Sequence, residues 1–152
     1  MRKLFSTGLL GMVVGAGVML AADVNPGRDV AQRLMNETRS AKGQAAAVAM
    51  QLRKGGDLSG IDARTAAIEN HAASIRSLLA ELEGSAVLNA RQQEALATAK
   101  TTAEVLTIML NNKKAVLEAG TSKSAREGAR QYARAVEVRA EMLEKLIRQM
   151  GL

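Results

Sequence analysis

Apolar residues recur along most of this chain at alternating steps of three and four. Between residues 59 and 83, four large apolar residues are spaced seven apart, at Ile61, Ile68, Ile75 and Leu82, and Thr65, Ala72 and Leu79 lie between them. Such spacing is typical of a helix that carries one apolar seam along its axis. The seam residues of three further stretches are Leu34, Ala41, Ala45, Val48 and Leu52; Leu96, Ala99, Ala103, Leu106, Leu110 and Leu117; and Ala129, Ala133, Val136, Ala140, Leu143, Ile147 and Met150. The pattern predicts helices over about 28–54, 59–83, 89–119 and 124–150.

Short polar and glycine-containing segments separate these stretches. Gly84 and Gly120 each follow a predicted helix, as expected for a residue that ends one. Three residues with short polar side chains stand at the start of predicted helices and suit an N-cap: Ser59, Asn89 and Ser124. We therefore expect three short turns between four helices.

Four helices of similar length joined by short turns predict an all-α fold. We expect an antiparallel up-down-up-down four-helix bundle over residues 28–152, preceded by an N-terminal signal or anchor helix. The alternative is a long helical hairpin that completes its bundle as a homodimer. Composition supports the class, because strong helix formers such as Ala, Leu, Glu, Arg and Met dominate. Phe5 and Tyr132 are the only aromatic residues, and the many seam alanines predict close helix packing with coiled-coil character.

The first 22 residues have a different pattern. Arg2 and Lys3 precede an uncharged run over 4–22, and a polar linker or turn follows over 23–27. This order is typical of an export signal. The segment is either a cleaved signal peptide or a retained anchor, since about 19 uncharged residues are near the lower limit for a membrane span. We expect a periplasmic or secreted protein, or one held at the inner membrane by residues 4–22.

Charge and motif content argue against several function classes. The net charge is +6, and removal of Arg2 and Lys3 leaves 6 − 2 = +4, because every acidic residue lies beyond Ala22. The chain has no cysteine, so it has neither disulfides nor thiolate metal sites. Ile68 stands where a di-iron bundle would need a glutamate three residues before His71. We expect no enzymatic activity, no metal site and no cofactor.

His71 and Met142 form the one candidate cofactor pair. They are expected at comparable heights on two helices of an antiparallel bundle, and facing each other they would resemble the architecture of cytochrome b562, which binds haem. That resemblance implies a haem-binding electron carrier, which is the alternative function. The family's ligands come from its first and last helices, whereas His71 lies on the second predicted helix. We expect His71 at the boundary of the seam, and we expect the scattered methionines to fill the core rather than bind copper.

Basic residues gather near the third turn. Arg126, Arg130 and Arg134 recur every four residues, and Lys113, Lys114 and Lys123 lie near the same turn. A basic patch of this kind suits anionic lipid head groups, another anionic envelope component or an acidic protein. Nucleic acid is not expected, because no aromatic residues are interleaved for base stacking. The alternative is a solvated face, as indicated by the i,i+4 pairs Glu141–Lys145 and Glu144–Arg148.

These observations predict an exported, non-enzymatic helical-bundle interaction module. Its partner would be an unknown protein or an anionic envelope component.

Overall fold

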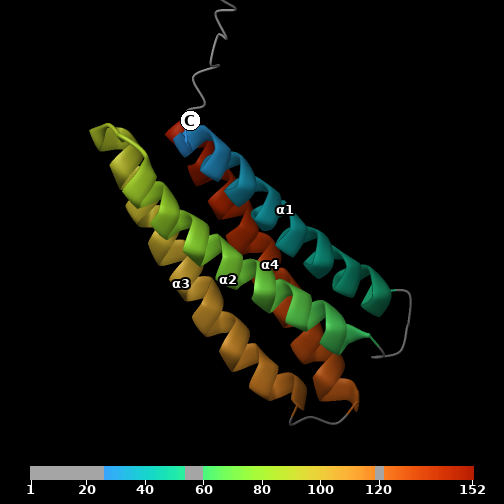
Figure 1. Cartoon of the computed structure of the whole chain (residues 1–152). Coiled ribbons are helices and arrows are strands. Elements are labelled where there is room, and N and C mark those ends of the chain that lie inside the picture. The colour runs from blue at the N-terminus through green and yellow to red at the C-terminus, as the bar shows by residue number, and fades with distance from the viewer. Residues whose placement is uncertain (1–25, 54–59, 119–121) are drawn as a thin grey trace, which may run out of the picture.

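A computed structural model describes residues 26–53, 60–118 and 122–152. Within these ranges the chain is all-helical, with four α-helices and no strand: α1 (Pro26–Arg53), α2 (Ile61–Ser85), α3 (Ala90–Glu118) and α4 (Ser122–Met150) (Figure 1). The predicted signal or anchor segment over 1–22 lies outside the described residues. None of the four helices is both long and apolar enough to cross a bilayer.

The four helices lie alongside one another. α1 packs against α2 and α4, α3 packs against α4, and α2 and α3 make the looser contact (Figure 1). Near the start of α1, Arg33 forms an ion pair with Glu81 near the end of α2. At the start of α3, Gln92 Nε2 donates to the carbonyl of Met150 at the end of α4, over 2.6 Å. In both pairs, the start of one helix therefore lies beside the end of its neighbour.

The core is built from the predicted seam. Every seam residue whose side chain is described is buried, and Ile68, Ile75 and Leu82 have no exposed surface. Leu117 lies in the part of α3 whose side chains are not described. The seam alanines Ala41 and Ala129 are likewise fully buried. Small side chains at these positions let neighbouring helices approach closely. The seam prediction is confirmed at the described positions.

Two helix starts follow from local chemistry. Asn89 and Gln92 form a reciprocal capping box, in which each backbone N–H donates to the other's side chain over 2.9 Å. The prediction of Asn89 as an N-cap is confirmed. α1 begins at Pro26, within the expected 23–27 turn. Proline suits the first helical position, because its φ is already helical and its missing N–H would have no partner there.

The other two starts differ from the prediction. α4 begins at Ser122, so Ser124 lies inside its first turn and the prediction of Ser124 as the N-cap is wrong. α2 follows Gly60, whose φ of 75° is the left-handed conformation that glycine adopts without a Cβ clash. Gly60 makes no side-chain cap, and Ser59 lies outside the described residues.

Tyr132 is a core residue that the predicted seam leaves out, although it lies three residues after Ala129 and four before Val136. It is only 1% exposed, and its hydroxyl donates to the Thr65 carbonyl over 3.4 Å. The Thr65 hydroxyl in turn donates to the carbonyl of Ile61, so the buried threonine is satisfied within its own helix. Burial, with a smaller contribution from the charge of Glu69, raises the pKa of Tyr132 well above its ordinary value.

Candidate functional site

His71 lies beside the buried seam of α2, as the sequence predicts, and its side chain contacts α1. Its Nδ1 is 2.7 Å from Glu37 Oε2, and the two side chains are 26% and 33% exposed. Met142 lies on the outside of α4, where its Sδ is 3.4 Å from Arg139 Nη1. A haem inside the bundle would need both ligand side chains directed into the core. The positions of His71 and Met142 therefore give the haem carrier no support.

The methionines divide between core and surface. Met35 and Met150 are buried, whereas Met50 and Met142 are 56% and 38% exposed. The expectation that they fill the core is wrong for Met50 and Met142, because both lie off the heptad seam. Among the described residues, no three His, Asp or Glu side chains come together to hold a metal ion.

An ion-pair network joins α1 to α4. The nearly buried Glu144 carboxylate lies 3.0 Å from Arg148 Nη2 and 3.5 Å from Lys42 Nζ. The predicted Glu144–Arg148 pair is thus confirmed. Glu141, expected to pair with Lys145, has its carboxylate 3.4 Å from Lys42 Nζ. Because these charges neutralise one another between two packed helices, their role is to join α1 and α4.

The predicted basic patch falls largely on the first half of α4. Lys123 is exposed and Arg126 half-buried, and the side chains of Arg130 and Arg134 are 57% and 77% exposed. The last two form ion pairs within α4, at 3.8 Å for Arg130–Glu127 and 3.7 Å for Arg134–Glu137. Exposed pairs of this kind contribute little to stability. Lys113 and Lys114 lie on α3, in the part whose side chains are not described.

The structure adds Arg53 to this patch. A shallow hollow of about 230 Å³ lies between α1 and α4, and it is lined by Ala49, Arg53, Arg130, Arg134 and Glu137. Arg53 belongs to the last turn of α1 and is far from α4 in sequence. Sequence spacing therefore carried no signal for this addition.

The same two arginines border a second, more apolar hollow on the α3 side of α4. This hollow, of about 550 Å³, is lined by Met109, Glu127, Arg130, Gln131, Arg134, Ala135, Val138 and Arg139. We call these residues, together with Met142 one turn beyond Val138, the α4 outer surface. Val138 and Met142 are each 38% exposed. The signal that could have identified them is their i,i+4 spacing off the core seam.

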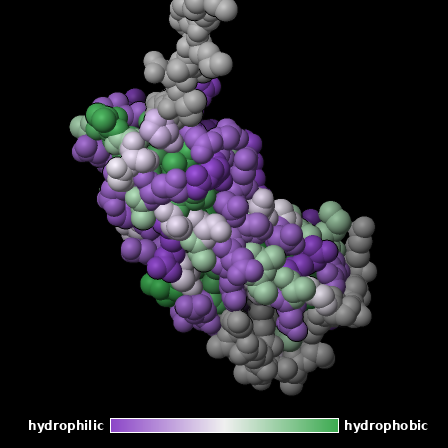
Figure 2. All heavy atoms as spheres, viewed as in Figure 1, coloured by the Kyte–Doolittle hydropathy of each residue, from purple (hydrophilic) through white to green (hydrophobic). Residues whose placement is uncertain are grey.

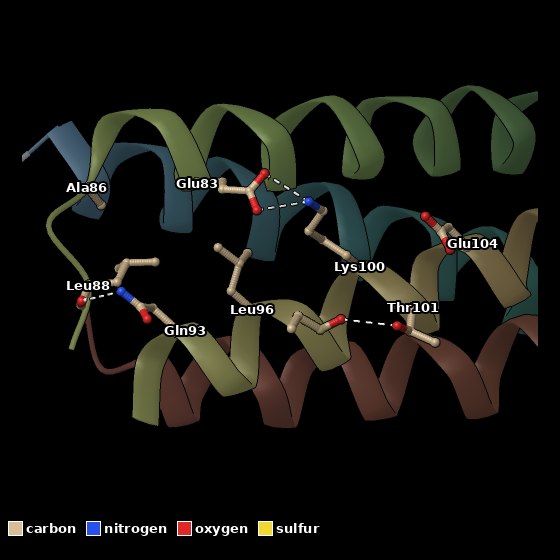
Figure 3. A pocket seen from close by; sticks show the side chains of 9 residues that line it. Glu83, Ala86, Leu88, Gln93, Leu96, Lys100, Thr101 and Glu104 are labelled. Carbon is tan, nitrogen blue, oxygen red and sulfur yellow. Dashed lines mark hydrogen bonds and ion pairs between the residues drawn. The ribbon is translucent and has the colours of Figure 1, made fainter. Parts of the chain in front are cut away.

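A third groove follows the looser contact between α2 and α3 (Figure 3). Lys100 crosses it, with Nζ 2.8 and 3.0 Å from the two carboxylate oxygens of Glu83. At the adjoining turn Val87 is fully exposed, and Figure 2 shows apolar atoms at this end and in smaller spots elsewhere on a largely hydrophilic face. Lys100 and Glu83 neutralise each other, so the groove has less charge with which to select a partner than the α4 outer surface.

The α4 outer surface thus combines guanidinium groups with partly exposed apolar side chains. Guanidinium groups bind carboxylates and phosphates through two parallel hydrogen bonds. Its chemistry suits recognition of an anionic and partly apolar partner. No known family model matches the chain, and no curated protein or solved structure is similar to it.

Proposed function

We propose that this protein is an exported, non-enzymatic interaction module that binds a protein partner or an anionic envelope component through the α4 outer surface. The observation that carries the proposal is the position of Arg130 and Arg134. Both are exposed and border an apolar hollow, and within the described residues each pairs with one glutamate of its own helix, at 3.8 and 3.7 Å. Arg2, Lys3 and the uncharged run over 4–22 support export to the periplasm or beyond, with a retained anchor as one form.

We further propose that the module is an antiparallel up-down-up-down bundle completed within one chain. The contact of α1 with α4 supports this arrangement, and so do the Arg33–Glu81 and Gln92–Met150 contacts between helix starts and ends. A hairpin completed by a homodimer would instead draw the partners of α1 from a second copy.

The direction of α1 bears on which partner is reached. The start of α1 and the C-terminus lie at the same end of the molecule, and α4 begins at the other end (Figure 1). If residues 4–22 remain in a membrane and α1 stands upright on it, that shared end is the membrane end. Met142 and Arg130 lie 8 and 20 residues before Met150, or roughly 12 and 30 Å from the membrane end of α4. A surface that runs along the side of the bundle in this way favours a protein partner over the lipid of that same membrane.

Site-specific photocrosslinking in the producing cell tests the proposal. A photoreactive residue at Val138 should yield a discrete conjugate, and the conjugate should disappear when Arg130→Glu and Arg134→Glu are added. A photoreactive residue at Arg76, exposed on α2, is the matched control and should not yield that conjugate. No conjugate from Val138, or the same conjugate from both positions, would overturn the proposal. Intact mass of the isolated protein would show whether residues 1–22 are retained.

A further inference from the structure

We propose that the occupant of the α4 outer surface is an acidic amphipathic helix of a partner protein, laid alongside α4 as an additional helix of the bundle. This inference rests on the proposed function and names the partner class for the same site. Three properties of the residues that form the surface support it: their charge, their spacing along α4 and the small extent of their exposed apolar area.

The positive charge of the α4 outer surface favours an acidic partner. The hollow is bordered by the three arginines Arg130, Arg134 and Arg139 and by one carboxylate, Glu127. On the α1 side Arg53 adds a positive charge and Glu137 a negative one, so that four guanidinium groups stand against two carboxylates. The excess of guanidinium groups favours carboxylates on the occupant, and it disfavours a second copy of the same basic face, since like charges across an interface repel.

The spacing of the apolar residues on this surface favours a helix as the partner. Ala135, Val138 and Met142 follow one another at steps of three and four, which makes a second apolar stripe on α4 outside its core seam. Two helices pack by seating such a stripe in the groove of the other. From Arg130 to Met142 the surface runs along twelve residue steps, or about 18 Å. This length fits roughly three turns of a partner helix.

The size of the apolar area favours a helix over a bilayer. Val138 and Met142 are each 38% exposed, and the side chains of Arg130 and Arg134 beside them are 57% and 77% exposed. The exposed apolar area is therefore a narrow stripe bordered by charge. Such a stripe suits the apolar face of one helix better than insertion into a bilayer. Methionine side chains suit such a contact, because they adapt to the shape of the occupant.

A synthetic peptide tests the inference on the protein isolated from the producing cell. The probe is a labelled helix of about 18 residues, with Leu at i, i+3, i+4 and i+7 and Glu at the exposed positions. Its control has Lys in place of every Glu. Fluorescence anisotropy should show binding of the Glu peptide and at least about tenfold weaker binding of the Lys peptide, because the arginines attract only the former.

Variants of the protein locate the binding. The double variant Arg130→Glu, Arg134→Glu should weaken the Glu peptide at least about tenfold, and Val138→Ser about threefold. The matched control Arg76→Glu, Arg91→Glu makes the same charge change at exposed positions of α2 and α3 and should stay within about twofold. Circular dichroism of every variant should show an unchanged helical fold, since all five substituted positions are exposed.

The outcomes separate this inference from the proposed function. Absence of Glu-peptide binding, or equal weakening by the control pair, overturns the acidic helix. If phosphatidylglycerol vesicles bind in a manner that requires Arg130 and Arg134 while the peptide does not, the occupant is a membrane and the inference is wrong. A Val138 conjugate in cells without peptide binding would retain the proposed function alone. Loss of both the conjugate and the peptide binding would overturn both.

Discussion

Replacement of Tyr132 by phenylalanine removes a single hydroxyl from the core. Tyr132 is 1% exposed, and its hydroxyl donates to the Thr65 carbonyl over 3.4 Å, which is long for an O–H donor. Such a bond contributes about 0.5 kcal/mol or less, at the low end of the usual range. At about pH 8, where the phenol is protonated in both states, we expect Tyr132→Phe to change the free energy of unfolding very little.

The effect grows with pH because burial raises the pKa of Tyr132 above its ordinary value of 10.0. Below that value, folded and unfolded chains both keep the phenolic proton. As pH rises past it, the unfolded chain loses the proton while the folded chain keeps it, so stability falls. At about pH 11 the unfolded phenol is roughly 90% ionised, and the loss is about 1.4 kcal/mol.

Urea unfolding followed by far-ultraviolet circular dichroism measures this loss. The wild-type protein and Tyr132→Phe should be compared at about pH 8 and about pH 11. Lysines titrate in the same pH range, but they are present in both proteins, so the difference between the two isolates the hydroxyl. Between the two pH values the wild type should lose about 1.4 kcal/mol more than the variant.

A pH-independent difference between the two proteins would refute the reasoning. So would phenolate absorbance that appears at about pH 11 while the circular dichroism is still that of the folded protein. Either result would show that Tyr132 ionises without unfolding and is not held in an apolar core.

Three further perturbations test the helix packing and ends, each by urea unfolding. Leu79→Ala should lower the free energy of unfolding by about 2–5 kcal/mol, whereas Met50→Ala, at a 56% exposed position, should change it by less than about 0.5 kcal/mol; similar losses would contradict the core assignment. Asn89→Ala should cost about 1 kcal/mol by removing the capping box, and no loss would mean that the cap does not form. Glu144→Gln should lower the free energy of unfolding by about 1–3 kcal/mol. Glu83→Gln should lower it less, because the exposed pair of Glu83 with Lys100 contributes at most about 1 kcal/mol. The reverse order would contradict the burial of Glu144.

The helices and their core could be predicted because both follow from local rules. A step of three or four residues returns to the same side of a helix, so the spacing of Ile68, Ile75 and Leu82 identified a buried face without knowledge of its partner. The Asn89–Gln92 cap joins residues three apart and is therefore readable in the same way. The start of α4 differs by two residues from the prediction, because the apolar spacing begins only at Ala129 and does not fix where the first turn begins.

The site could be predicted only in part. The repeat of Arg126, Arg130 and Arg134 identified one charged side of α4. It carried no information about Arg53 or Met109, which come from other helices. Tyr132 was left out of the predicted seam for another reason: between Ala129 and Val136 the spacing allows either Tyr132 or Ala133, and the structure buries both.

By itself, the sequence determined the helical class, the seams and the basic character of α4, because helix geometry relates residues only a few positions apart. Only the tertiary structure decided that Arg130 and Arg134 border an apolar hollow on one side and Arg53 on the other. It also decided that His71 contacts Glu37 rather than Met142. The physical reason is that these contacts depend on which helices pack together and at what height. The helices adopt the packing that buries all four seams at the same time.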